Sequence, residues 1–207
     1  MISLNFKYNF TFFIKIIFVC LFICLKSYAD DTKPENNMTI IGSYDANIKI
    51  KIYSSLTCPH CANFHNKIVP KIKKEYVDPG IVQLIFMDFP LDQAAFNASK
   101  LLHCLNQEKK ITYLDTIYEN QNKWTTGSNI DEINNNLKKI VKDFGIDPNQ
   151  FDKCLSNESI SDKILSERID ANKKYSIDST PTIIINEEKL DGSATFKNIK
   201  KTIEKII

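Results

Sequence analysis

Apolar and polar side chains alternate along residues 46–55, and this period of two predicts a β-strand with its isoleucines on one face. Apolar residues then recur at every fourth position over residues 62–76, which predicts an amphipathic helix that Pro70 should kink. The apolar run 81–89 predicts a second strand, buried inside a sheet. Strand, helix and strand in this order form a βαβ unit.

Helical periodicity dominates the next part of the chain. Short breaks that contain glycine, proline or polar residues separate five predicted helices, at 92–106, 108–122, 129–144, 148–156 and 158–175. The strand pattern returns at 180–190, where residues 186–188 resemble a hairpin turn. A final helix over 196–207 carries one apolar stripe that ends at Ile206 or Ile207.

The order of these elements predicts an α/β protein in which a helical block interrupts a strand-rich domain. We expect residues 30–91 to form the first, βαβ half of that domain and residues 176–207 to form its second, ββα half. Residues 92–175 would be a helical domain inserted between the two halves.

The first 29 residues predict a secretory signal peptide. Two early lysines precede an uninterrupted apolar run at 16–25, and Ser27 and Ala29 are small residues at the −3 and −1 positions of a cleavage site after Ala29. The alternatives are a retained membrane anchor, for which the apolar stretch is short, and lipid attachment at Cys24. Cleavage would export the protein to an oxidising compartment.

Charge and cysteine content change after cleavage. The remaining chain of 207 − 29 = 178 residues has 27 − 3 = 24 basic and 25 acidic side chains, a net charge of −1. Such a balance gives no basic surface for nucleic acid, so we expect no nucleic-acid partner. Four of the six cysteines remain, and an even number in an exported protein favours disulfide chemistry.

The candidate chemistry is concentrated in the motif Cys58-Pro59-His60-Cys61, directly after the first strand. Cys58 should lie at the first turn of the helix, where free backbone N–H groups and the helix dipole favour the thiolate. Pro59 suits the first helical position, and His60 adds a donor and, when protonated, a positive charge. We expect a lowered pKa for Cys58 and a higher one for the less exposed Cys61, which makes their disulfide an oxidant.

The motif has two other interpretations. Cys58, Cys61 and His65 fall on one helical face and are residue types that bind Zn²⁺. A fourth zinc ligand would have to come from His103, Cys104 or Cys154. A purely structural Cys58–Cys61 disulfide is the other alternative, although so short a loop removes little chain entropy.

The motif after a strand, the segment Thr180-Pro181-Thr182 before another strand and the signal peptide together resemble the DsbA-like branch of the thioredoxin superfamily, of the type found in alphaproteobacteria. The resemblance covers roughly residues 40–207 and implies a thioredoxin fold with an inserted helical domain. It also implies that Pro181 is cis, that its loop lies against the active-site disulfide, and that the Thr180 backbone binds extended substrate.

The resemblance also bears on the remaining two cysteines and on the strand before the motif. Cys104 and Cys154 both lie in the helical block and could pair or remain as thiols, and similarity to some alphaproteobacterial proteins implies a second, structural disulfide there. The family often has a buried acidic residue six positions before the first cysteine. Here that position is Ile52, so solvent or another group must serve in proton transfer to the dithiol.

The resemblance implies a periplasmic thiol:disulfide oxidoreductase that introduces disulfide bonds into unfolded or reduced exported proteins. Such an enzyme needs no cofactor or metal, and a membrane reoxidase partner would regenerate its disulfide. The isomerases of the family carry an extra N-terminal dimerisation domain, so its absence here favours a monomer. The alternatives are a disulfide reductase or isomerase, and a non-catalytic surface binding protein or antigen that keeps the fold.

Overall fold

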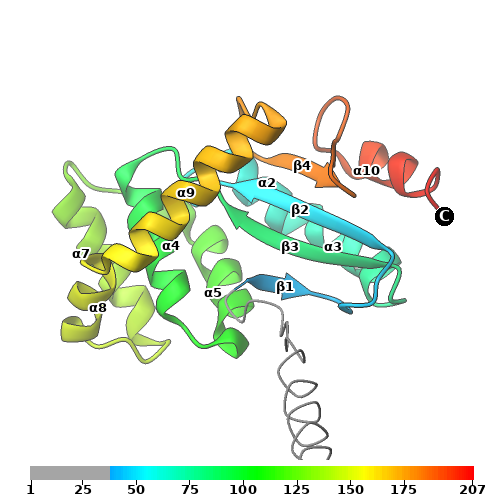
Figure 1. The fold of residues 1–207 in the computed structure, drawn as a ribbon. Coiled ribbons are helices and arrows are strands. Elements are labelled where there is room, and N and C mark those ends of the chain that lie inside the picture. Colours follow the sequence, from blue (N-terminus) through cyan, green and yellow to red (C-terminus); the bar gives the residue numbers. More distant parts are fainter. Residues whose placement is uncertain (1–37) are drawn as a thin grey trace, which may run out of the picture. The chain divides into compact units, whose positions relative to one another are not determined.

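A computed structural model describes residues 38–207, so the expected signal peptide, its cleavage after Ala29, and the anchor and lipidation alternatives lie outside the described residues. Within that range, the strands form one sheet in the order β1-β3-β2-β4-β5 (Figure 1). The strands are β1 (Thr39–Ile41), β2 (Ile48–Ser54), β3 (Val82–Asp88), β4 (Thr182–Ile185) and β5 (Glu188–Lys189). The predicted strands therefore form, within one or two residues of their expected ends.

Only the central β2–β3 pair is parallel, as the predicted βαβ unit requires, and the other neighbours are antiparallel. The edge strand β1 was not predicted. It has three residues, too few to reveal a period of two, and it depends on pairing with β3. The hairpin turn consists of Asn186 and Glu187, both at positive φ, and Glu188 already belongs to β5.

The helix after β2 is divided, in agreement with the kink expected near Pro70. It consists of α2 (Pro59–Lys67), α3 (Val69–Ile72) and a π-helical turn, η1 (Lys73–Val77). The chain then enters β3, whose first residues pack under this divided helix. The elements that position the motif are therefore β2, which leads into it, and α2, which starts with it.

Six helices separate β3 from β4 along the chain, one more than predicted because the expected helix 108–122 is split. They are α4 (Gln93–Cys104), α5 (Gln107–Glu119), α6 (Gln121–Trp124), α7 (Ile130–Lys142), α8 (Pro148–Leu155) and α9 (Glu158–Tyr175). The last helix, α10 (Phe196–Ile203), is shorter than predicted. Ile206 and Ile207 are 45% and 72% exposed, so the apolar stripe ends at Ile203, the last residue that reaches the core.

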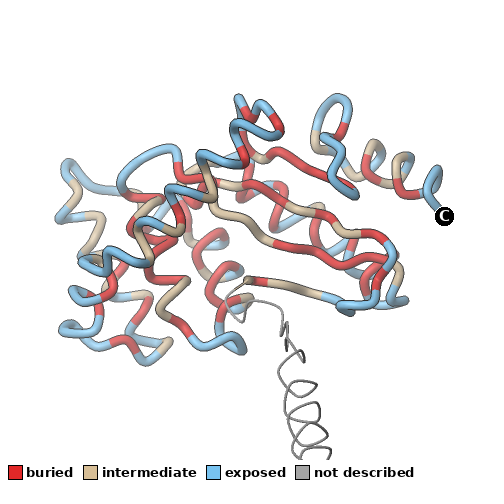
Figure 2. Tube along the Cα trace, in the orientation of Figure 1, coloured by how far each residue is buried: buried red, intermediate tan, exposed pale blue. Residues whose placement is uncertain are grey.

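Both faces of the sheet are covered (Figure 2). Isoleucines of β2 and β4 on one face pack against α2, α3 and α10, and Tyr53 and Ile184 on the other face pack against the C-terminal part of α9. A third apolar cluster joins the N-terminal end of α2, including Cys61, to helices α4–α8. The predicted α/β class is confirmed. No helix in the described part of the chain is long and apolar enough to cross a membrane.

Candidate active site

The dithiol lies at the N-terminus of α2. Cys58 is the N-cap residue in extended conformation, and Pro59 occupies the first helical position, where its missing N–H costs nothing. Cys58 is partly exposed, whereas Cys61 is 1% exposed, and both are free thiols in this structure. One sulfur is therefore open to a substrate and the other is enclosed.

The loop that contains Thr180 and Pro181 lies against the dithiol, although it is 122 residues away in sequence. The Cys58 thiol donates a 3.4 Å hydrogen bond to the Thr180 carbonyl oxygen. The Thr180–Pro181 peptide bond is cis, as the resemblance implied. The Thr180 side chain is buried beside both sulfurs and its hydroxyl has no conventional partner among residues 38–207, so it can turn toward a thiolate.

The two thiols have opposite acidities. Partial burial alone would raise the pKa of Cys58, but interactions with the Thr180 side chain, with Cys61 and with the His60 backbone N–H lower it overall. Deeper burial raises the pKa of Cys61 to about 12, although the Thr180 side chain opposes this effect, and the charge of Cys58 adds to it. The reduced dithiol therefore loses its first proton from Cys58, while Cys61 keeps its proton to a much higher pH.

His60 lowers the pKa of Cys58 through its backbone N–H. Its N–H stabilises the Cys58 thiolate, while its exposed side chain lines a groove beside the motif. This groove has a volume of about 400 Å³ and is bordered by Phe64, by the Thr180–Pro181 loop and by residues 190–194.

Two residues that the sequence analysis did not identify hold the segment before the motif. The Gln121 side chain donates to the carbonyl oxygens of Leu56 at 2.8 Å and Cys58 at 3.0 Å. Thr57 donates a 2.6 Å hydrogen bond to Asp92, which also caps α4 by accepting from a backbone N–H. Gln121 of α6 and the N-cap of α4 thus hold residues 56–58 in place. An N-cap pattern at Asp92 was readable in the sequence, but its contact with Thr57 was not.

His65, which the zinc interpretation needed, has a different partner. Its Nε2 lies 2.7 Å from Asp115, and its ring packs against the rings of Tyr118 and Phe86. Among residues 38–207 there is no group of three or more His, Cys, Asp or Glu side chains that could hold a metal ion. His65 therefore fixes α2 against α5.

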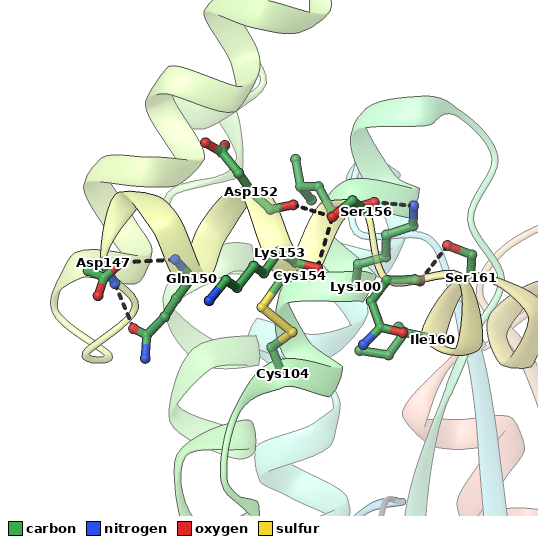
Figure 3. The surroundings of a disulfide bond; sticks show 12 residues. Lys100, Cys104, Asp147, Gln150, Asp152, Lys153, Cys154, Ser156, Ile160 and Ser161 are labelled. Atoms are coloured by element: carbon green, nitrogen blue, oxygen red, sulfur yellow. Dashed lines mark hydrogen bonds between the residues drawn. A yellow bond between two sulfur atoms is a disulfide. The ribbon is translucent and has the colours of Figure 1, made fainter.

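Cys104 and Cys154 are joined in a disulfide in the structure (Figure 3). Their Cα atoms are 6.1 Å apart, and the bond connects the end of α4 to α8 across a sequence separation of 50 residues. The bond borders a cavity of about 310 Å³ to which Cys58 and Cys61 do not contribute. The two cysteine pairs are thus separate sites.

Comparison with known proteins agrees with this geometry. A family model described as thioredoxin matches residues 34–205, so the chain belongs to the thioredoxin family. The crystal structure of Wolbachia pipientis alpha-DsbA1 is similar, with a TM-score of 0.74 and 30% sequence identity over 83% of this chain and 92% of that chain. BdbD from Bacillus subtilis, at 23% identity, shares the fold with a TM-score of 0.68 over 82% of this chain and 92% of that chain.

Curated relatives point to the same chemistry. "Disulfide bond formation protein D" of Bacillus subtilis is 25% identical over 174 residues, 80% of this chain and 75% of that protein. "Probable disulfide bond formation protein D" of Bacillus anthracis is 29% identical over 171 residues, 80% of this chain and 76% of that protein. The chain spans between 62% and 76% of the length of the curated relatives that it matches.

Fold, family and relatives together define a DsbA-like disulfide oxidoreductase. The predicted class and the predicted thioredoxin fold are thereby confirmed.

Proposed function

We propose that this protein is a dithiol oxidase that introduces disulfide bonds into exported proteins. Cys58 carries the sulfur that the substrate thiolate attacks, and Cys61 is its buried partner. The observation that carries the proposal is the asymmetry of the dithiol. A lowered Cys58 pKa stabilises the reduced enzyme, and a disulfide whose reduced form is stabilised is a stronger oxidant.

In the proposed reaction, a substrate thiolate attacks the Cys58 sulfur of the Cys58–Cys61 disulfide. Cys61 leaves as a thiolate, and a mixed disulfide joins the substrate to Cys58. A second thiolate of the same substrate then attacks its own sulfur in that bond and expels Cys58. The substrate leaves oxidised by two electrons, and the enzyme is left as a dithiol.

Thr180 and Pro181 form the proposed substrate-binding loop. The Thr180 backbone already accepts a hydrogen bond from Cys58, so a bound peptide backbone would pass within reach of that sulfur. Pro59 and His60 contribute to the proposed catalytic motif by starting α2 and by supplying a backbone N–H. The Cys104–Cys154 disulfide is proposed as structural, because it borders a separate cavity.

The setting is proposed together with the reaction. The signal-like segment 1–29 favours export to the periplasm, where a membrane reoxidase would regenerate the disulfide, and the protein would act as a monomer without cofactor, metal or nucleic acid. The division into segments 30–91, 92–175 and 176–207 remains part of this proposal.

The reduction potential of the dithiol separates an oxidase from a reductase. Equilibration with glutathione should give a value nearer the roughly −120 mV of the strongest oxidants than the roughly −270 mV of thioredoxin. The oxidised protein should also restore activity to a reduced, denatured ribonuclease without added oxidant. A potential near −270 mV would contradict the oxidase, and an inert dithiol would favour a binding protein that keeps the fold.

A further inference from the structure

A buried carboxylate lies at the end of β3, close to the dithiol. Asp88 is the last residue of β3 and the register partner of Ser54, the last residue of β2. Neighbouring strands are about 4.8 Å apart, so the two side chains leave the same face of the sheet next to each other. Asp88 Oδ2 lies 2.7 Å from His103 Nε2, and the two side chains are 9% and 6% exposed.

Two hydroxyl-bearing side chains, Ser54 and Tyr118, border a small cavity next to Asp88. The cavity has a volume of about 10 Å³, the space that one water molecule needs. Burial raises the pKa values of Cys61 and Tyr118, and the Ser54 side chain lowers both by a smaller amount. The charge of Cys61 also raises the pKa of Tyr118, and both residues belong to the same buried cluster.

Cys61 needs a route for a proton because it cannot remain charged. Its side chain is 1% exposed and burial raises its pKa to about 12, so the leaving thiolate must gain a proton. The same proton must leave again when the disulfide re-forms. The strand before the motif supplies no acid of its own, and Ile52, six positions before Cys58, is apolar and 2% exposed.

We propose that the Asp88–His103 pair carries this proton, exchanging it with Cys61 through Ser54, Tyr118 and a water molecule in the cavity. The inference rests on the proposed function, because it concerns the same dithiol. When substrate attack breaks the Cys58–Cys61 bond, a proton from solvent passes along this path, by way of the Asp88 carboxylate, to the Cys61 sulfur and gives a thiol. During reoxidation Cys61 returns the proton to the pair, and its thiolate attacks Cys58 and expels the partner's thiolate.

The charges around Asp88 suit a proton carrier. Burial alone would raise its pKa, but His103, the Ser99 side chain and the charge of Lys110 lower it overall, so the carboxylate is ionised at neutral pH. His103 Nδ1 is buried without a hydrogen-bond partner in the described part of the chain, so the position of the ring is set by the contact of its Nε2 with Asp88. The other titratable groups facing this site are Tyr113 and Tyr118 of α5 and Cys61 of α2.

Reoxidation of the reduced protein by a small disulfide tests the relay, since it separates two steps. Cys58 first forms a mixed disulfide, and Cys61 then closes the intramolecular bond. In D88N we expect the first step to keep its rate and closure to slow by about a hundredfold near pH 7, a typical loss for general acid–base catalysis. Acid quenching and mass spectrometry measure both steps, and the mixed disulfide should accumulate.

The pH profile distinguishes proton transfer from a structural effect. In D88N closure should rise tenfold per pH unit as Cys61 ionises, whereas the wild type should be flatter. The control is D115N, because Asp115 forms the other aspartate–histidine pair at the same 2.7 Å distance, with an exposed carboxylate. D115N should close at the wild-type rate.

A folded D88N that closes at the wild-type rate with the wild-type pH profile would overturn the relay. If D88N does not fold, Y118F decides, since it keeps the buried ring and removes only the hydroxyl. A severalfold slower closure in Y118F supports the relay, and an unchanged rate overturns it. Failure of the wild type to form any mixed disulfide would instead contradict the proposed function.

Discussion

The two cysteine pairs of this protein lie at opposite ends of helices. Cys58 is at the N-terminus of α2, whereas Cys104 is the last residue of α4 and Cys154 is next to last in α8. The N-terminal end of a helix stabilises negative charge and the C-terminal end opposes it. A thiolate is therefore favoured at Cys58 and disfavoured in the second pair.

The pairs also differ in what a bond between them achieves. A bond between Cys58 and Cys61 closes a very short loop and constrains the unfolded chain little. The Cys104–Cys154 bond closes a loop of 50 residues and joins two helices that pack in the same core. The Cys58–Cys61 pair therefore provides the reactive sulfur, and the Cys104–Cys154 pair stabilises the fold. Variants of each pair can test this difference.

The largest expected effect is the loss of activity in C58S. Without the partly exposed sulfur, oxidation of a reduced substrate should fall to the rate of uncatalysed exchange. The double variant C104A/C154A should retain oxidation within about twofold, because its cysteines border a different cavity. Oxidative refolding of a reduced ribonuclease measures both. Loss of oxidation in a folded C104A/C154A protein would remove the distinction between the pairs.

Stability should respond in the opposite way. C104A/C154A should lose about 4 kcal/mol of unfolding free energy, because a loop of 50 residues is no longer closed in the unfolded chain. C58A/C61A is the matched control and should change far less. Guanidinium denaturation under non-reducing conditions gives both values. Equal losses in the two double variants would contradict the assignment of a structural bond.

The stability of the reduced form should depend on pH in a way that the oxidised form does not. The lowered Cys58 pKa stabilises the folded reduced state fully only above the ordinary thiol value of 9.0, and this contribution is lost as pH falls through the folded pKa. The reduced-minus-oxidised difference in unfolding free energy should therefore decrease on acidification, by about 1.4 kcal/mol for each unit of pKa depression.

This measurement belongs below about pH 8.5, because the raised pKa of Cys61 begins to destabilise the reduced form above the ordinary thiol range. Urea titrations of both redox forms between pH 4 and pH 8 give the difference. In C58S the acid-side dependence should disappear. A difference that stays constant with pH in the wild type would mean that Cys58 has an ordinary pKa.

The smallest effect is expected for Q121L. It leaves the Leu56 and Cys58 carbonyl oxygens without their donor, at a cost of about 1–3 kcal/mol in stability. Because Cys58 is then held less firmly at the helix N-terminus, its pKa should move up toward an ordinary thiol. Thermal unfolding and thiol titration measure the two effects. The variant Q150L is a control for the loss of a glutamine hydrogen bond at another site: it removes the capping contact with the Asp147 N–H in α8, so it should lower stability but leave the Cys58 pKa unchanged.

The sequence predicted what depends on neighbouring residues. The strand before the motif, Pro59 at the first helical position and the acidity difference between Cys58 and Cys61 follow from local pattern. The cis bond before Pro181 followed from the resemblance. Contacts between distant elements were not predictable: β1 needs β3, and Gln121 reaches Cys58 across 63 residues of sequence.

The Asp88–His103 pair belongs to the same class of contact. In the sequence, His103 lies in a predicted helix and was considered only as a possible zinc ligand, and Asp88 is one residue of the predicted strand 81–89. Only the packing of α4 against the end of β3 brings the carboxylate and the imidazole within 2.7 Å. The absence of an acid at position 52 indicated that solvent or another group must serve, but it did not say which.

The pKa of Cys58 is the most direct test of the central claim that this pair is an oxidising dithiol. Thiolate absorbance of the reduced protein, followed from pH 3 to pH 10 with C58S as the blank, gives that value. The account predicts a transition clearly below the free-thiol value. A transition near 8.5 would contradict it.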